Sequence, residues 1–552
     1  MSSLVTTAND LVLNQQIKER LVATPLAWYA YEKILFRIAV IFFICICIPN
    51  SVAWFEHVIA IDWTSLHYRD LYDIARFGSG INIFGNTIFG SNLLGYANWV
   101  TTLLISIAVG LAWSWIVRAR GTERSEYQVL HYWLRAVVRY RAGIGIIGFG
   151  FTKLLPVQMP YPSLGLLNTD FGDFTAQKIY WLSIGIVPWY QIFAGIVEVL
   201  AGSLLLFRKT TAIGAVLLFG ALGDIVYVNF AYDGGVHVYS SYFVLLSAFL
   251  LVPEIPRLYN LLIRERVTQP FRFYPVLPQW LKITRVGLKS GVLLLFLVVF
   301  FYLQLVNFLY DPYKQPSVAG VLQLRGNYAV TEFRLNNNLL PANAQDTLRW
   351  QEVTFENWST LTFRVNRPTP LDLSNGGGDP QRDVNRTFEV SCVAGGQRVF
   401  HYEADEKEQT LYLEDKYKSI PDRRNRPAGV GGDGGSEKNL QSTAARNKPA
   451  VRTNAVLWKP EEWISPAARE RIGNEVDKID AKAQTTRRRR EFAQAISLEN
   501  RNRMILQYST ADNGNIVVLT GLNENKDSIK VVLNRVNRNY ALSASTLNAG
   551  KY

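Results

Sequence analysis

The distribution of apolar and polar positions divides the chain near residue 310. Before this point, long apolar stretches follow one another, and a helix needs about 20 such residues to cross the hydrocarbon core of a membrane. They predict membrane-spanning helices at residues 35–55, 97–117, 130–153, 187–207, 210–231, 237–253 and 289–310. We therefore expect a membrane-embedded all-α bundle of about seven helices.

Beyond Asp311-Pro312 the apolar residues recur at every second position, as in half-buried antiparallel strands. The alternating residues are Leu361, Phe363 and Val365, then Phe388, Val390 and Cys392, then Leu411 and Leu413, and Val531 and Leu533. Turn residues separate these segments at 336–338, 394–396 and 523–525. This pattern predicts a C-terminal antiparallel all-β meander or barrel.

The segment 421–500 interrupts the strand pattern. Its opening is rich in Gly and polar residues and cannot bury enough apolar area to order itself. The part from Pro466 to Asn500 permits a helix but is mostly charged, and it contains four arginines at 487–490. We interpret it as a flexible charged insertion, solvated or in contact with an anionic partner or lipid headgroup.

These patterns divide the chain into six parts. They are a cytoplasmic segment 1–34, two helices with a long outer loop in 35–127, a four-helix unit in 128–262, a basic loop and the last helix in 263–310, the β domain in 311–420 and 501–552, and the insertion 421–500.

The positive charges indicate an orientation. Sixteen Lys and Arg residues beside the predicted spans fall on one side and four on the other, and short cytoplasmic loops are enriched in these residues. The count places the N-terminus in the cytoplasm and the β domain outside. The formal net charge is +13, but the basic residues cluster beside apolar stretches or in one late polar stretch, so we expect a lipid bilayer and no nucleic acid as partner.

Cysteines give no sign of a metal site or of a disulfide framework. Cys45 and Cys47 lie within an apolar stretch without the spacing of a zinc motif, and Cys392 stands alone. No cleavable signal peptide is evident, so the first apolar helix is expected to serve as the insertion signal.

Ionisable residues inside the predicted spans are the clearest candidates for function, because each costs several kcal/mol in lipid unless it is paired or faces water. They form an expected intramembrane polar cluster of Arg139, Arg141 and Glu198. Counted from their membrane faces, Arg141 and Glu198 reach a similar depth, and we hypothesise that they pair. Such a pair could fix helix packing or bind a polar ligand or proton.

A second group of polar residues is predicted at the outer face: Lys153, Asp224, Asn229, Tyr232, Asp233 and His237. His237 could exchange protons or be an ordinary interfacial residue. The outer segment 56–96 is expected to carry a short surface helix near Leu66–Arg76. Small residues that include Gly195, Gly202, Gly220 and Gly223 favour close helix packing.

Three stretches in residues 130–262 carry a resemblance to a known family: RAGIGIIGFGFTKLLPVQMPYPSLGLL, WYQIFAGIVEVLAGSLLLFRKTTAIGA and VNFAYDGGVHVYSSYFVLLSAFLLVPEIPRL. They look like the DoxX-like bacterial membrane proteins, a superfamily that includes the membrane subunit of thiosulfate:quinone oxidoreductase. This chain has His237 where family members often have Lys. Around Arg325–Tyr328 and Asp346–Trp350, the tail resembles the lipocalin-like sheet appended to some such proteins of Bacteroidetes.

The resemblance implies an inner-membrane protein with a periplasmic β domain. It suggests an accessory subunit of a quinone-linked redox process, with a redox partner protein and with a ligand or partner bound by the β domain. Quinone is the cofactor that is compatible with this resemblance, but the sequence shows no cofactor motif. Whether the chain is an enzyme is left open. The alternatives are a non-enzymatic envelope anchor or assembly protein and, third, a transporter.

Overall fold

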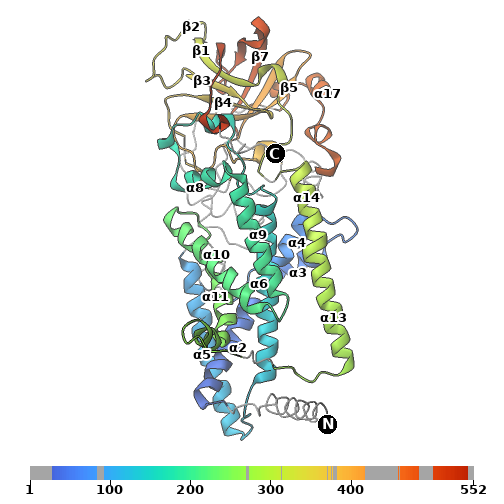
Figure 1. The fold of residues 1–552 in the computed structure, drawn as a ribbon. Helices are drawn as coiled ribbons and strands as arrows, with labels where there is room; N and C mark the ends of the chain where they lie inside the picture. Colours follow the sequence, from blue (N-terminus) through green and yellow to red (C-terminus); the bar gives the residue numbers. More distant parts are fainter. Residues whose placement is uncertain are drawn as a thin grey trace, which may run out of the picture.

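The computed structural model shows a helical bundle with a β-barrel at one end (Figure 1). The residues that it describes are 28–81, 83, 93–268, 273–312, 314–369, 371–373, 376, 382–416, 458, 460–483 and 501–544.

Every predicted span coincides with a long helix or a helical run in the described residues. These are α2 (Ala30–Cys47), α5 (Leu94–Ala119), α6 (Gln128–Leu154), α9 (Pro188–Leu205), α10 (Thr211–Ala231), α11 (His237–Leu251), and α13 (Gln279–Leu293), which continues through the π-helical η3 (Leu294–Val299) into α14 (Phe300–Tyr310). The last run begins ten residues earlier than predicted.

Five helices in the described part of the chain are long and apolar enough to cross a membrane. They are Gly95–Ala119, Pro188–Leu205, Thr211–Ala231, His237–Leu262 and Gln279–Tyr310, of which the fourth joins α11 to η2 (Val252–Glu254) and α12 (Ile255–Leu262). The predicted number of seven spans is not reached because α2 and α6 carry more charge: α2 contains Glu32, Lys33 and Arg37, and α6 contains three arginines and Lys153.

Short helices fill the loops on the side of the bundle that faces the barrel. They are α3 (Val52–Ile59), α4 (Tyr68–Ala75), α7 (Leu164–Leu167), η1 (Phe171–Asp173) and α8 (Ala176–Gly185). The predicted surface helix corresponds to α4, but its placement on the surface is wrong. Tyr68, Leu71, Tyr72 and Ala75 form one apolar face and are buried in the bundle, against Phe151, Phe296 and Phe300.

Helices α6 and α9 cross closely because glycines remove side chains from their contact. A Cβ atom on Gly195 would lie 2.3 Å from the backbone nitrogen of Leu154, and one on Gly150 would lie 2.9 Å from that of Val199. In contrast, Gly220 and Gly223 on α10 have open space at the Cβ position. The prediction that small residues permit close packing therefore holds for α6 and α9 and not for this part of α10.

The C-terminal domain is a closed antiparallel barrel of eight strands. Its strands are β1 (Gly326–Leu335), β3 (Glu352–Phe355), β4 (Thr360–Arg364), β5 (Gln397–Asp405), β6 (Thr410–Asp415), β7 (Arg503–Ala511), β8 (Ile516–Leu522) and β9 (Ser528–Val536), with β2 (Asn338–Leu339) as a short hairpin partner of β1. Pairing of β1 with β9 closes the barrel. The predicted antiparallel all-β domain is confirmed at this level.

One predicted strand is wrong. Phe388, Val390 and Cys392 lie in successive turns, and Cys392 has a φ of 60°. Phe388 and Val393 instead pack against Leu166 and neighbouring aromatic residues of the α7–α8 region. Alternation over five residues does not distinguish a strand from a loop whose apolar residues are used in docking.

The segment predicted to be a flexible insertion contains an ordered part. Residues Trp458, Trp463, Ile464, Ala468 and Ile472 form an apolar cluster that packs on the outer face of β6 and β7. It is built on α16 (Pro460–Trp463) and α17 (Pro466–Ile472), followed by η7 (Glu475–Lys478) and η8 (Ala481–Ala483). The prediction is thus wrong for 460–483, because two tryptophans supply the apolar area that the polar composition concealed; the arginines at 487–490 lie outside the described residues.

Short 3-10 turns complete the described structure: η4 (Leu322–Leu324), η5 (Asp383–Asn385), η9 (Asp512–Gly514) and η10 (Ala541–Ala544).

Replacing Gly195 by Ala is predicted to destabilise the bundle. The added methyl group meets backbone atoms, which cannot move aside, and overpacking of this kind typically costs about 1–3 kcal/mol. Gly220→Ala is the matched control, since it adds the same methyl group to open space and gains helix propensity. Thermal unfolding of the detergent-solubilised protein should show a lower midpoint for the first variant only, and equal midpoints would contradict the close crossing.

Candidate functional site

A buried ion pair joins α6 to α9. Lys153 Nζ binds Glu198 Oε1, and the two side chains are 11% and 2% exposed. Lys153 lies in the last turn of α6, and Glu198 lies near the middle of α9. Because the helices approach closely at Gly150 and Gly195, the two charged groups are in contact.

The second carboxylate oxygen of this pair receives no hydrogen bond within the part of the chain that the structure describes. Glu198 Oε2 is buried, and no hydrogen bond reaches it from the described residues. A buried acceptor without a donor is costly, and such a group commonly marks a functional site. The pair therefore combines a cationic donor, Lys153, with an oxygen that can accept a hydrogen bond or a proton.

The predicted pair between Arg141 and Glu198 is wrong. Glu198 lies beside Gly150 of α6: a Cβ atom added to Gly150 would be 3.2 Å from the Cβ atom of Glu198. Arg141 precedes Gly150 by nine positions, which corresponds to about 13 Å along the helix axis. The prediction compared the depths of Arg141 and Glu198 counted separately along each helix. At the point where α6 and α9 cross, the residue of α6 next to Glu198 is Lys153.

Arg141 has a structural environment of its own. Its guanidinium donates to the Tyr242 hydroxyl (3.0 Å) and to the carbonyl of Ala75 (2.5 Å), and it lies 3.9 Å from the ring centre of Phe77. Tyr242 passes its own hydrogen bond to the carbonyl of Ile46. These contacts tie the segment after α4 into the bundle and leave Arg141 apart from Glu198.

Arg139 lies in an environment separate from those of Glu198 and Arg141. Two residues before Arg141, it lies on another face of α6, over the ring of Tyr140. It is in electrostatic range of Arg135 and Arg208, toward the end of the bundle away from the barrel. The predicted cluster of Arg139, Arg141 and Glu198 is therefore three separate sites.

Part of the predicted outer-face group gathers around Tyr180, a residue that sequence reasoning missed. The ring of Tyr180, on α8, lies 5.0 Å from that of Tyr232. Burial raises the pKa of Tyr180 to about 12, and Tyr190, Asp224, Tyr232 and Glu198 add to the shift. Tyr180 thus lies beside Tyr232 and within electrostatic range of Asp224 and Glu198. Its position in a loop helix gave no signal of this role in the sequence.

The remaining outer-face residues are placed elsewhere. The side chain of Asn229 accepts a hydrogen bond from the backbone of Val236 and donates to the carbonyl of Ile225, so it shapes the turn between α10 and α11. Asp233 has a φ of 51° in this turn. His237 stacks between Phe230 and Tyr96, with Nδ1 3.4 Å from the Tyr96 hydroxyl. His237 is therefore directed toward α5 rather than toward Lys153.

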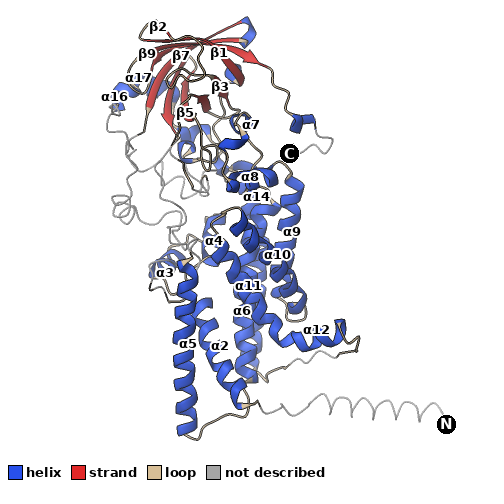
Figure 2. Ribbon diagram, turned by 90° about the vertical axis from the view of Figure 1, so that its left-hand side faces the viewer, coloured by secondary structure: helices blue, strands red, loops and turns tan. Residues whose placement is uncertain are grey.

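The loop between α6 and α9 supports the barrel (Figure 2). The backbone N–H groups of Leu164 and Gly165 donate to the Glu356 carboxylate of the barrel at 3.0 and 2.7 Å. Burial raises the pKa of Glu356 to about 7, although the hydrogen bonds from these two donors lower it. The loop that connects α6 to α9, the helices that carry Lys153 and Glu198, is thus hydrogen-bonded to the β domain.

Lys178 makes a second buried contact between this loop and the β domain. Its ammonium group binds the carbonyl of Phe388 and lies 3.7 Å from the centre of that ring. Burial lowers the pKa of Lys178 to about 8. Because a buried cation requires a fixed partner, this contact holds the loop in register with the barrel.

Apolar side chains fill the barrel interior. Phe333, Trp350, Phe355, Phe363 and Phe400 are buried there, together with aliphatic residues from the strands. Trp350 and Phe363 stack with ring centres 3.8 Å apart. This interior is a packed core.

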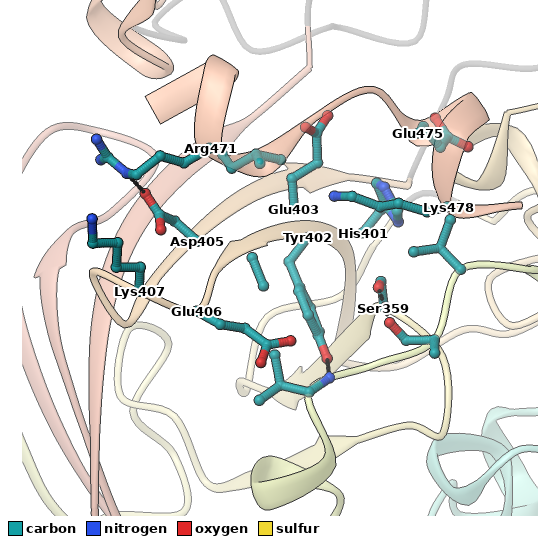
Figure 3. Close-up of a pocket in the computed structure, with 15 residues that line it drawn as sticks. Ser359, His401, Tyr402, Glu403, Asp405, Glu406, Lys407, Arg471, Glu475 and Lys478 are labelled. Atoms are coloured by element: carbon teal, nitrogen blue, oxygen red, sulfur yellow. Dashed lines mark hydrogen bonds and ion pairs between the residues drawn. The ribbon is translucent and has the colours of Figure 1, made fainter. Parts of the chain in front are cut away.

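A polar cavity of about 450 Å³ lies beside β5, where η7 and the end of α17 approach it (Figure 3). Most of its charged residues have partners: Arg471 binds Asp405 at 2.8 Å, and Glu475 accepts from Arg382 at 3.0 Å. His401 is buried in its wall, and its Nδ1 has no hydrogen-bond partner in the described residues. This cavity is a second candidate binding place, with less distinct chemistry than the Lys153–Glu198 pair.

Within the described residues, no group of three or more His, Cys, Asp or Glu side chains is arranged to hold a metal ion. The chemistry available at the Lys153–Glu198 pair is donation and acceptance of hydrogen bonds and transfer of protons.

Comparison with known proteins gives one partial similarity. A stretch of 91 residues, 15% of the chain, is 36% identical to an uncharacterised protein, YwoB, of Bacillus subtilis strain 168 and covers 59% of that protein. The chain therefore matches less than two thirds of this relative. No family model matches the chain, and no solved structure matches it.

We predict that the stability of the barrel decreases as the pH rises from about 4.5 to 7. Over this range the folded protein retains the proton on Glu356 that the unfolded chain has lost, so deprotonation favours unfolding, by at most roughly 3 kcal/mol. Glu356→Gln should remove this dependence, because the amide keeps an oxygen acceptor and cannot ionise.

The measurement is tryptophan-monitored thermal unfolding of the full-length protein between pH 5 and 7.5. The control is Glu352→Gln, which removes a carboxylate at the start of β3 that is 43% exposed and paired with Arg538. An unchanged pH slope in the Glu356 variant would contradict the assignment.

Proposed function

We propose that the chain is a DoxX-like inner-membrane protein that acts as an accessory subunit of a quinone-linked redox process. In this proposal α2 and α6 complete seven spans, the N-terminus is cytoplasmic and the lipocalin-like barrel is periplasmic. The observation that carries the proposal is the buried Lys153–Glu198 pair, in which the second carboxylate oxygen has no hydrogen-bond partner among the described residues.

The pair suits the polar head of a membrane-soluble quinone. A quinone carbonyl needs a hydrogen-bond donor and a quinol hydroxyl needs an acceptor; Lys153 and Glu198 provide one of each. Reduction of a quinone to a quinol takes up two electrons and two protons. In this proposal Glu198 exchanges the protons, and the electrons come from a redox partner protein.

The barrel supports this proposal as a docking element for that partner. It is fixed to the loop between α6 and α9 through Glu356 and Lys178, and to the end of α14 through the buried pair of Arg386 with Asp311. A protein bound to the barrel is thereby held at a defined place above the Lys153–Glu198 pair.

The same attachment favours a second candidate, a non-enzymatic envelope anchor. Buried contacts between the barrel and the bundle are what an adaptor needs to hold a partner at a fixed distance from the membrane. An anchor requires the barrel but has no use for the unpaired oxygen of Glu198, and this difference separates the two candidates.

Replacing Glu198 by Gln should abolish quinone binding and, because it leaves Lys153 without its counter-charge, lower the unfolding midpoint of the quinone-free protein. The amide preserves the shape but cannot take a proton, and it weakens the hold on Lys153. We expect quinone extracted from the purified protein to fall at least about tenfold, the equivalent of 1.4 kcal/mol, and added quinone should no longer raise the unfolding midpoint.

The control is Glu254→Gln, which breaks the partly exposed ion pair of Glu254 with Arg135 elsewhere in the bundle. If the wild-type protein, purified from quinone-containing membranes, holds no quinone and gains no stability from it, the redox proposal fails. Copurification of a partner that survives Glu198→Gln and is lost on removal of 312–552 would then support the anchor.

A further inference from the structure

Four cations from three elements converge at the end of the bundle away from the barrel. Arg139 belongs to α6, Arg208 to the turn between α9 and α10, and Arg285 and Lys289 to α13. Lys289 is in electrostatic range of both Arg139 and Arg285, and Arg139 is in range of Arg208. These four residues are called the cationic cluster below.

Aromatic side chains hold the cluster together. Tyr132 accepts a hydrogen bond from Arg285 at 3.0 Å, and its ring lies 5.0 Å from the guanidinium of Arg208. Lys289 lies 4.1 Å from the ring centre of Phe207. The nearby carboxylate, Glu254, is engaged by Arg135 and Arg257. The contacts that hold Arg208, Arg285 and Lys289 in place thus include aromatic rings, the Tyr132 hydroxyl group and, for Arg208, the carbonyl of Phe273.

Arg139 adds a donor that the protein does not use. Its Nε atom is buried and makes no hydrogen bond within the described residues. A buried guanidinium nitrogen without an acceptor is unfavourable, and here other cations lie within electrostatic range of it. An anionic oxygen would satisfy both the donor and the charge.

Helix α13 diverges from α6 at this end (Figure 1) and contributes no buried residue. Its apolar side chains are open to the surroundings; Ile283 and Val286, for example, are 64% and 60% exposed. In a membrane, the space beside α13 is filled by acyl chains. The occupant of this place must therefore be anionic at one end and apolar along the rest.

We propose that the cationic cluster binds the headgroup of an anionic phospholipid, whose acyl chains lie along the apolar face of α13. Charge complementarity determines the choice, because phosphate oxygens meet Arg139, Arg208, Arg285 and Lys289 while the chains cover the exposed aliphatic residues. The bound lipid joins α13 to α6 at the end where the two helices separate. This site is independent of the Lys153–Glu198 pair.

The test is a titration of the full-length protein in neutral detergent with phosphatidylglycerol, compared with phosphatidylcholine of the same acyl chains. Phosphatidylglycerol should raise the thermal unfolding midpoint, and phosphatidylcholine should do so much less. Each cation removed is expected to weaken binding on the order of fivefold, so Arg139→Gln with Lys289→Gln should shift the titration midpoint by about 25-fold.

The double variant Arg118→Gln with Arg120→Gln is the control, since it removes the same charge from the exposed end of α5. Lys289→Gln alone, on the loosely attached α13, keeps the test available if the double variant unfolds. Equal stabilisation by the two lipids, or an unchanged midpoint in the cluster variants, would overturn the proposal. Equal stabilisation by inorganic phosphate would show a site for free anions and also overturn it.

Discussion

The close crossing of α6 and α9 is the contact on which the rest of the bundle depends. Gly150 and Gly195 bring the two helix backbones together, and only at this distance can the ammonium group of Lys153 reach Glu198. In a medium of low dielectric an unpaired charge is very unfavourable, so the crossing and the ion pair stabilise each other. The loop that leaves α6 at this point carries α7 and α8, which in turn support the barrel. One helix contact therefore positions both the intramembrane pair and the β domain.

Buried charges in this protein are accommodated in different ways, and the differences separate structure from function. Arg141 has neutral partners, a hydroxyl group, a carbonyl group and an aromatic ring, and it connects α4 to the bundle. Arg386 and Asp311 neutralise each other at the junction with the barrel. Glu198 Oε2 and Arg139 Nε are buried and have no hydrogen-bond partner within the described residues. Both of our proposals concern these incomplete environments.

Lys153 lies in the last turn of α6 and Arg139 near its middle, and the two proposed sites use opposite charges. Glu198 presents an anionic oxygen near the barrel, which suits a neutral ligand that donates hydrogen bonds. The cationic cluster of Arg139, Arg208, Arg285 and Lys289 suits a ligand that is itself anionic. A lipid at this cluster would steady α13, and α13 continues into α14, whose end is joined to the β domain at Asp311. The lipid and the barrel thus restrain the two ends of the same helical run.

The sequence by itself determined the class of each half of the molecule. Long apolar stretches and residues alternating with a period of two identified helices and strands, since each pattern follows from the local geometry of its element. Only the tertiary structure decided the partners. Arg141 and Glu198 were matched by depth, but side-chain contacts depend on where two helices cross and on how each is rotated about its axis, which no single-helix pattern records. The same reason explains why Tyr180 was missed, why α4 is buried, and why the tryptophans of the insertion order residues 460–483 on the barrel.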